Sequence, residues 1–185
     1  MADERKVFLE RDDLGRTISR MAYEIVEKST TVSEVVLIGI RSRGVHLARR
    51  LARKIQESAK IAPPVGVIDV TAYRDDRSQE RGSAGISELE VPVSVDDRTI
   101  VLVDDVIFRG RTIRAAMDAV ERLGQPQRIL VAVLIDRGAR ELPIRADIVG
   151  KNIEAGAGQR VNVLLEESDG VDQVTITQWQ GRSTT

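Results

Sequence analysis

Four short apolar segments, separated by stretches of helical periodicity, constrain the fold of this 185-residue chain most strongly. They are rich in β-branched residues and almost continuously apolar, which is typical of strands buried on both faces of a sheet. Before and between them, apolar residues recur every three or four positions, as in amphipathic helices. Strands that alternate with helices predict an α/β fold with a mainly parallel twisted sheet flanked by helices. The predicted strands are 34–40, 65–72, 100–103 and 128–135, and the predicted helices fall within 14–26, 45–55 and 113–123.

The rest of the chain contributes an arm and a hairpin. Residues 73–98 are mostly polar, with a weak strand signal near 88–93. Connections of this length inside a compact domain are often functional lids, so we expect a flexible β-arm over 73–98, with a solvated hairpin as an equal alternative. Two apolar stretches joined around Asp169 and Gly170 predict a C-terminal hairpin over 161–179. The length fits a single domain, 1–185.

The composition excludes several classes of protein. The 28 Lys and Arg residues are balanced by 29 Asp and Glu, a formal net charge of −1, which argues against a globally basic nucleic-acid-binding protein. The absence of Cys excludes a disulfide scaffold, a thiol nucleophile and Cys-ligated zinc, and a single His argues against a Ser-His-Asp triad. No apolar run reaches the ~18 residues of a membrane helix, and the charged first residues lack a signal core. We therefore expect a cytoplasmic protein without a membrane partner.

The segment 101–112 carries the clearest chemical signal. Two adjacent carboxylates, Asp104 and Asp105, follow a predicted strand, and a short loop with Gly110 then leads into a helix whose first turn holds Thr112. Ligands of open α/β sheets bind at the carboxyl ends of strands, and a helix N-terminus offers free N–H groups to a phosphate. The carboxylates could accept hydrogen bonds from sugar hydroxyls or hold Mg²⁺ through water. The alternative is a generic strand-turn-helix with exposed acids.

Two better-known phosphate motifs are absent. The segment lacks the first glycine and the lysine of a Walker A loop, and the chain has no G-x-G-x-x-G. The residues 101–112 instead resemble the phosphoribosyl-pyrophosphate (PRPP) binding motif of type I phosphoribosyltransferases. Residues 38–48 resemble the pyrophosphate loop of that family. Residues 69–76 and 136–152 are similar to its bifunctional bacterial members, which attenuate the pyrimidine biosynthesis operon and have uracil phosphoribosyltransferase activity.

The resemblance spans residues 10–180 and implies the type I phosphoribosyltransferase fold with roles by position. The implied catalytic residues are Asp104, Asp105 and Arg137. The two aspartates would contact the ribose hydroxyls, and the 5-phosphate would be held by Arg109, Gly110, Arg111 and Thr112. Pyrophosphate would meet Arg41, Ser42, Arg43 and Gly44, with Arg74 closing from the arm. The base pocket would be lined by Asp136, Arg137, Ile148 and Val149. Mg²⁺ would arrive with PRPP and water, without direct protein ligands.

The implied reaction converts uracil and PRPP to UMP and pyrophosphate, by displacement at the anomeric carbon without a covalent nucleophile. The implied regulatory partner is the pyr leader mRNA, bound in response to the uridine nucleotides UMP and UTP, with no DNA partner. A homodimer or homotetramer is implied as well. The candidate RNA-binding residues are Arg16, Arg20, Arg140, Arg145 and Lys151, which on residue type alone are better explained as ordinary solvated charges.

Three positions depart from the family pattern and keep alternatives open. Arg109 stands where the family has a small residue, and either binds the phosphate or crowds it. Ala139 replaces a His, and Ile148 replaces an aromatic residue. Arg109 favours a weak enzyme, or an RNA-binding nucleotide sensor with little or no transferase activity. A purine-type salvage phosphoribosyltransferase is a third possibility, against which the similarity of 136–152 argues.

Overall fold

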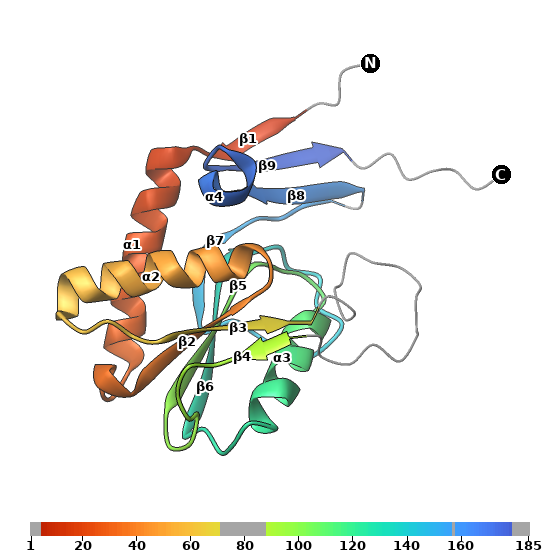
Figure 1. Cartoon of the computed structure of the whole chain (residues 1–185). Helices are drawn as coiled ribbons and strands as arrows, with labels where there is room; N and C mark the ends of the chain where they lie inside the picture. The colour runs from red at the N-terminus through yellow and green to blue at the C-terminus, as the bar shows by residue number, and fades with distance from the viewer. Residues whose placement is uncertain (1–4, 71–87, 157, 179–185) are drawn as a thin grey trace.

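The computed structural model describes residues 5–70, 88–156 and 158–178 and contains a larger α/β core and a smaller antiparallel sheet (Figure 1). The strands of the core are β2 (Val35–Ile40), β3 (Val65–Asp69), β4 (Glu88–Glu90), β5 (Thr99–Ile107), β6 (Arg128–Asp136) and β7 (Ile148–Asn152). They form one sheet in the order β4-β3-β2-β5-β6-β7. All neighbours pair in parallel except β4, which runs antiparallel to β3 at the edge. The predicted mainly parallel sheet is confirmed.

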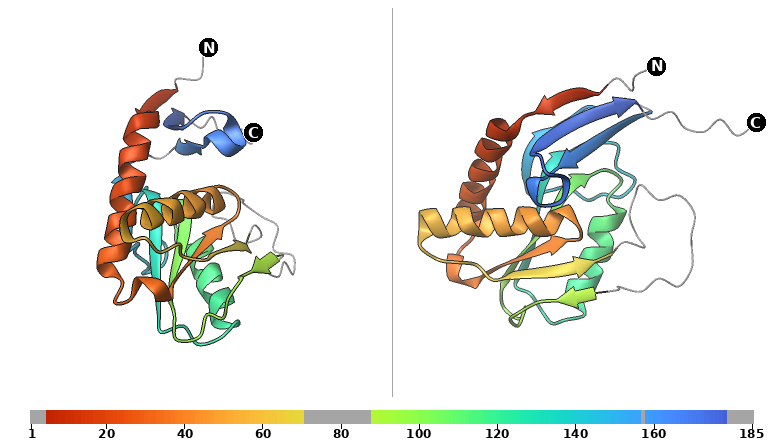
Figure 2. Two further views of the ribbon diagram at one scale, coloured as in Figure 1. Left: turned by 60° about the vertical axis from the view of Figure 1, so that its left-hand side comes forward. Right: turned by 45° about the horizontal axis from the view of Figure 1, so that its top comes forward.

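Helices cover both faces of this sheet, as the alternation of elements predicts (Figure 2). They are α1 (Arg11–Lys28), α2 (Arg43–Ala59) and α3 (Arg111–Glu121), with a 3-10 turn η1 (Val32–Glu34) before β2. On β5, Val101 and Val103 pack in the apolar cluster under α1 and α2, while Ile100 and Leu102 pack in the cluster under α3. Each such fully buried side chain contributes about 1.5–3 kcal/mol. Burial on both sides explains why these strands are continuously apolar in sequence.

A second, three-stranded sheet lies above the core in Figure 1. It consists of β1 (Lys6–Leu9), β8 (Gln159–Leu164) and β9 (Gln173–Gln178), in the order β1-β9-β8, with a short helix α4 (Glu166–Asp169) between β8 and β9. We call β1, β8, α4 and β9 the hood. The predicted C-terminal hairpin is present as β8 and β9, although residue 179 lies outside the described residues. The sequence did not predict β1, a strand of four residues.

The predicted arm is described only at its C-terminal end. Residues 73–87, which include Arg74, lie outside the described part of the chain. Residues 88–90 form β4 and pair with the end of β3, with Leu89 opposite Ile68. The weak strand signal near 88–93 is therefore confirmed in part, as an edge strand of the core sheet.

Several predicted strand boundaries differ from the structure, among them the end of the strand 65–72, which stops at Asp69, and the end of the strand 100–103, which bears on the site. The sequence predicts a buried strand over 100–103, followed by Asp104 and Asp105 at its end and then by an exposed turn. In the structure β5 continues through Asp104 and Asp105 to Ile107, and Asp104 lies opposite Val133 of β6. Because the parallel pairing with β6 extends the strand, Asp104 is buried rather than exposed. The two carboxylates therefore sit on a rigid strand and not on a loop.

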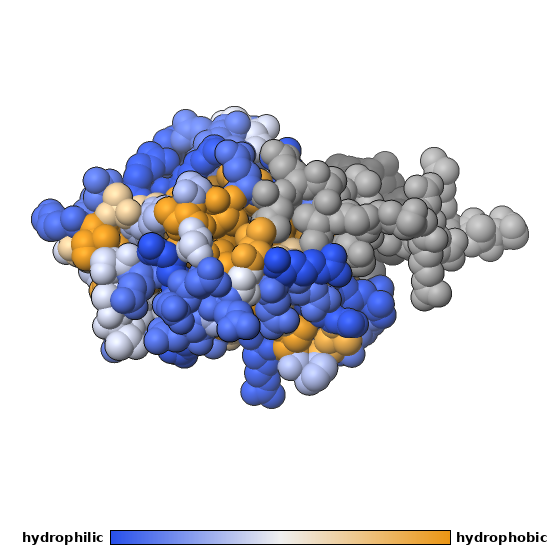
Figure 3. Space-filling model, turned by 60° about the horizontal axis from the view of Figure 1, so that its bottom comes forward, coloured by the Kyte–Doolittle hydropathy of each residue, from blue (hydrophilic) through white to orange (hydrophobic). Residues whose placement is uncertain are grey.

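The surface away from the hood is mostly polar. In Figure 3, which views the described residues from that end, the apolar surface falls into several separate patches. None of the helices in the described ranges is long and apolar enough to cross a membrane.

Candidate functional site

A cleft of about 340 Å³ opens at the carboxyl ends of the neighbouring parallel strands β2 and β5. Strands β2 and β5 lie side by side, but the chain leaves β2 through α2 toward β3 and leaves β5 through α3 toward β6. The loops after the two strands diverge, and a switch point of this kind is where open α/β sheets bind ligands. The hood strands β8 and β9 supply the opposite wall of the cleft. The fold thus places a cleft at the predicted position.

Side chains from all four predicted subsites line this cleft. They are Arg41 and Arg43 from the predicted pyrophosphate loop (38–48), Asp104 and Asp105 from β5, Thr112 from the segment 108–112, which we call the phosphate loop, and Arg137 directly after β6. They come from segments up to about a hundred residues apart in sequence. The structure therefore brings together cations, carboxylates and a helix N-terminus in one cavity.

The two aspartates are held by neighbouring backbone groups. The Asp104 carboxylate accepts a hydrogen bond from the N–H of Asp105 at 2.9 Å, and the Asp105 carboxylate accepts one from the N–H of Val106 at 2.9 Å. Each contact fixes the orientation of a side chain on an already rigid strand. Two fixed carboxylates facing a cleft suit the recognition of vicinal hydroxyls.

The phosphate loop is shaped by a glycine in a left-handed conformation. Gly110 has φ of 94° and is the N-cap of α3, a geometry that glycine adopts with least cost. The turn starts α3 beside the cleft, which Thr112 lines, and the free N–H groups of a helix N-terminus suit a phosphate. Arg109 and Arg111 flank the glycine, and both form ion pairs with Glu141, at 3.2 and 2.6 Å. The hydrogen bond from Arg111 lowers the pKa of the Glu141 carboxyl.

Arg137 joins the phosphate loop to the hood. Its guanidinium stacks on the Phe108 ring at 4.2 Å, while Arg109 lies over the same ring at 5.2 Å. Its Nη2 donates to the carbonyl of Gln159 in β8 at 2.7 Å. Burial lowers the pKa of Arg137, and the positive charge of Arg109 lowers it further. Within the described residues, Nε of Arg137 is buried without a hydrogen-bond partner, and the residue lines the cleft.

The pyrophosphate loop packs very closely on the core. The Arg41–Ser42 peptide bond is cis, and the Arg41 N–H donates to the carbonyl of Ile68 at 2.9 Å. A Cβ atom on Gly44 would lie 2.4 Å from the carbonyl oxygen of Val103. The loop therefore fits against β5 only because residue 44 has no side chain, and this contact places Arg43 beside the two aspartates.

Three of the predicted base-binding residues do not line the cleft. The Ile148 side chain is fully buried in the core cluster beneath α1 and α2. The Asp136 carboxylate binds Arg140 at 2.6 Å and the N–H of Gly138 at 2.8 Å. The carbonyl of Val149 accepts a hydrogen bond from Arg20 at 2.8 Å. These groups support the strands β6 and β7, and only Arg137 of the predicted set reaches the cavity.

Further lining residues, most of them from the hood, were missed by the sequence analysis. They are Arg5, Arg160, Val161, Asn162, Val163, Leu164, Thr175 and Thr177, together with Phe108 of the phosphate loop. Asn162 of β8 donates to the Thr177 hydroxyl of β9 at 3.1 Å. Thr175 and Thr177 are two residues apart and therefore lie on the same face of β9. This spacing was the one sequence signal that could have indicated a polar face of β9 toward the cleft.

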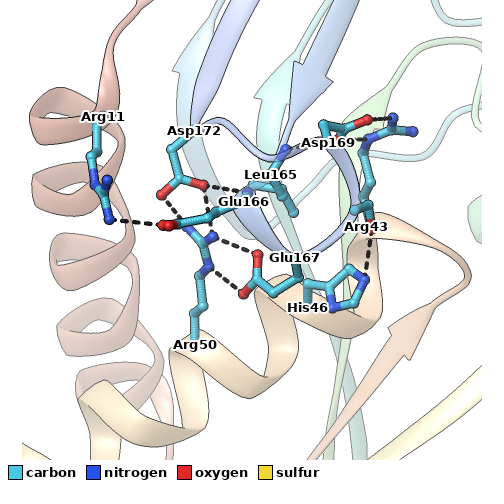
Figure 4. Close-up of polar contacts among 10 residues, drawn as sticks. Arg11, Arg43, His46, Arg50, Leu165, Glu166, Glu167, Asp169 and Asp172 are labelled. Atoms are coloured by element: carbon cyan, nitrogen blue, oxygen red, sulfur yellow. Dashed lines mark hydrogen bonds and ion pairs between the residues drawn. The ribbon is translucent and has the colours of Figure 1, made fainter.

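The hood is fixed to α2 by a group of charged side chains shown in Figure 4. Arg50 of α2 donates to Glu167 from Nε and Nη2 and to Asp172 from Nη1 and Nη2, so it uses two edges of its guanidinium, at 2.6–2.9 Å. Arg43 binds Asp169, and His46 lies 2.9 Å from the Ser168 hydroxyl. We call these residues the α2–hood cluster.

At Asp172 and Glu167 of this cluster, pairing with Arg50 lowers the carboxyl pKa by more than burial raises it. Burial raises the pKa of Asp172, but the hydrogen bonds from Arg50 and from the N–H of Glu166 lower it more, so the net shift is downward. At Glu167 the hydrogen bond from Arg50 is the largest cause of a lowered pKa. Both carboxyls are therefore ionised at neutral pH, and their contribution to stability is lost only as the pH falls below their ordinary values of 3.8 and 4.5.

The candidate RNA-binding residues divide into two groups. Arg140 has a side chain that is only 18% exposed, and it binds Asp136 and three backbone carbonyls, so it acts as a structural residue of the loop 137–147. Arg20 pairs with Glu24 and donates to the carbonyls of β7. The other three candidates, Arg16, Arg145 and Lys151, are exposed. Because Arg20 joins α1 to β7, Arg16 and Lys151 stand on neighbouring elements.

The match to known proteins agrees with this geometry. A family model described as the phosphoribosyl transferase domain matches residues 8–164. The chain belongs to the phosphoribosyl transferase family. The protein named bifunctional protein PyrR of Chloroflexus aurantiacus is 49% identical to it over 176 residues, 95% of this chain and 96% of that protein. The protein of the same name from Pelotomaculum thermopropionicum is 48% identical over 95% of this chain and 97% of its own length.

Solved phosphoribosyltransferase structures share the fold. The hypoxanthine phosphoribosyltransferase of Trypanosoma cruzi superposes with a TM-score of 0.72 and 17% sequence identity, covering 95% of this chain and 97% of that one. At this identity the likeness concerns the fold alone. It confirms the type I phosphoribosyltransferase architecture inferred from the residues 101–112.

Proposed function

We propose that this phosphoribosyl transferase converts uracil and PRPP to UMP and pyrophosphate, and that it attenuates transcription of the pyrimidine operon by binding pyr leader mRNA in response to uridine nucleotides. The transferase activity is supported by one observation: the same cleft is lined by Asp104, Asp105, Thr112, Arg41 and Arg43. It offers carboxylates for a ribose between a site for one phosphate and a site for a pyrophosphate. The similarity to the two PyrR proteins supports uracil as the base and mRNA as the second partner.

The chemistry follows from how these groups are arranged. The bond from the anomeric carbon to pyrophosphate breaks, the base nitrogen forms a bond to the same carbon, and the nitrogen loses its proton. Arg41 and Arg43 stabilise the charge of departing pyrophosphate, and Asp104 and Asp105 fix the ribose as positive charge develops on it. No side chain needs to act as a covalent nucleophile. Arg137 lines the same cleft, and we expect it to bind the incoming base.

Mg²⁺ fits this site as a companion of the substrate. Within the described residues, no group of three or more His, Cys, Asp or Glu side chains could hold a metal ion. Two carboxylates do face the cleft, and they could hold through water a Mg²⁺ that is bound to the substrate phosphates. Bound in this way, it would neutralise charge on the pyrophosphate.

Arg109 is the residue that raised the alternative of a nucleotide sensor with an altered phosphate loop. Its guanidinium is directed to Glu141 and to the Phe108 ring, and its side chain does not appear among the cleft-lining groups. We therefore expect Arg109→Thr to raise KM for PRPP about threefold through the loss of one nearby cation, with kcat unchanged. Steady-state kinetics with varied PRPP measures both constants. A severalfold rise in kcat would show instead that Arg109 crowds the phosphate.

RNA binding should depend on the exposed cations of α1 and β7. We expect affinity for a pyr leader hairpin to fall with salt at a log–log slope of about −2 per chain, from three phosphate contacts by Arg16, Arg145 and Lys151. Arg16→Ala combined with Lys151→Ala should flatten the slope, measured by filter binding with UMP present. Arg53→Ala, which removes an exposed cation from α2, is the matched control and should leave the slope unchanged. Equal effects of both changes would argue against this surface.

A further inference from the structure

We propose that Asp169 of the hood is a positioning residue for the pyrophosphate end of the cleft, and that it acts by holding the guanidinium of Arg43. The inference rests on the proposed transferase function. It adds a residue far from the PRPP motif, on the short helix α4, to the groups that determine PRPP affinity. Figure 4 shows the two side chains meeting across the gap between α2 and the hood.

The contact between the two residues has two points. Nη2 of Arg43 donates to Oδ1 of Asp169 at 2.8 Å, and Nε donates to Oδ2 at 3.2 Å. Two parallel hydrogen bonds between a planar guanidinium and a planar carboxylate fix the plane of the arginine as well as its position. The side chains are 28% and 19% exposed, so solvent weakens this pair less than a surface ion pair.

Asp169 is itself held in place. Its Oδ2 accepts a hydrogen bond from the N–H of Leu165 at 2.8 Å, and its own N–H donates to the carbonyl of Leu165 at 2.7 Å. Burial raises the pKa of its carboxyl, but the hydrogen bonds from Arg43 and from the N–H of Leu165 lower the pKa by more. The net shift is downward, so the group is ionised at neutral pH. A fixed carboxylate anchored to α4 is thus the reference point for an arginine that begins α2.

Arg43 also faces the cleft, beside Arg41 and the two aspartates of β5. Its two contacts with Asp169 use Nε and Nη2, and Nη1 takes part in neither. The guanidinium can therefore bind Asp169 along one edge and an anion through Nη1. A carboxylate near a pyrophosphate site would by its charge alone weaken anion binding, so its benefit must come from orientation. Ordering a long arginine in advance reduces the entropy lost when the ligand binds.

The experiment compares PRPP affinity in variants of the full chain. We expect Asp169→Ala to raise the dissociation constant for PRPP, measured by calorimetry with Mg²⁺ present, about tenfold. Asp169→Asn, which keeps one acceptor oxygen for Arg43, should lie between Asp169→Ala and the wild type. In steady-state assays KM for PRPP should rise in the same order, while KM for uracil stays constant. A rise in both KM values, or no rise in either, would overturn the proposal.

Two controls separate positioning from general support of the hood. Asp172→Asn removes a hood carboxylate of the same cluster, but one that binds Arg50 and not Arg43. It should lower the melting temperature and leave PRPP affinity within about twofold of the wild type. Equal losses of PRPP affinity in Asp172→Asn and Asp169→Ala would show that only hood stability matters. In an Arg43→Ala background, Asp169→Ala should add no further loss, and full additivity would contradict action through Arg43.

Failure of the proposed function is distinguishable from failure of this inference. If the wild type formed no UMP, the transferase activity would be wrong, and the dissociation constant for Mg²⁺-pyrophosphate would still compare Asp169→Ala with the wild type. If the wild type formed UMP and Asp169→Ala bound PRPP with unchanged affinity, the inference alone would be wrong.

Discussion

Replacing Asp104 and Asp105 together by asparagine should lower kcat/KM for PRPP about a thousandfold without unfolding the protein. Both carboxylates face the cleft from β5, and Asp104 is only 7% exposed. A hydrogen bond to a charged group contributes about 1.5–3 kcal/mol, so two of them account for a loss of this size. The asparagine side chains keep an oxygen for the N–H groups of Asp105 and Val106 that now orient the carboxylates. The strand should therefore remain intact.

The measurement is steady-state kinetics with PRPP varied, together with calorimetric titration of PRPP. Asp118→Asn is the matched control, because Asp118 is an exposed carboxylate of α3 at 3.9 Å from Arg114. It should change kcat/KM by less than about twofold, as expected of an exposed pair. Unchanged PRPP affinity in the double variant would refute the assignment of the ribose site to these two residues.

The second large effect is expected from a single added methyl group. Gly44→Ala should destabilise the protein by about 2–3 kcal/mol, because the new Cβ would lie 2.4 Å from the backbone carbonyl of Val103. Neither backbone segment can rotate out of the way as a side chain could. The loop 41–44 must move away from β5 to relieve the clash, so PRPP affinity should fall at least tenfold as Arg41 and Arg43 leave their positions.

Chemical denaturation and PRPP titration measure these two effects. Gly15→Ala provides the control, since a Cβ at that position of α1 meets no other atom within 4 Å. Alanine stabilises a helix interior relative to glycine by about 0.5–1 kcal/mol, so this variant should be slightly more stable and bind PRPP normally. Normal PRPP affinity in Gly44→Ala would show that the position of the loop does not determine binding.

The sequence predicted the central strands β2, β5 and β6 because most of their residues are buried on both faces of the sheet. Continuous apolar runs such as 34–40 and 128–135 leave few other structures open to the chain, and the structure contains strands at both. The same applies to the phosphate loop, where a strand, a glycine and a helix start follow one another within twelve residues. Local information was sufficient for these features.

Features that depend on pairing between segments distant in sequence could not be predicted from local apolar patterns or motifs. The extension of β5 through Asp104 is set by its neighbour β6, which sequence periodicity does not reveal. Strand β1 is only four residues long and is defined by its pairing with β9. Likewise, the engagement of Arg140 with Asp136 and the burial of Ile148 follow from tertiary packing. In the sequence the acidic residues of α4 look like an ordinary polar turn. Their pairing with Arg43 and Arg50 appears only when α2 is folded beside them.

The most direct test of the account is the formation of UMP from uracil and PRPP in the presence of Mg²⁺. Hypoxanthine, guanine and orotate serve as competing bases, and the products are separated by chromatography. The account predicts uracil-dependent UMP and an equal amount of pyrophosphate, with no product from the other three bases. Turnover with hypoxanthine or guanine would instead indicate a purine salvage enzyme. Nucleotide binding without turnover on any base would contradict the transferase assignment and leave a nucleotide sensor.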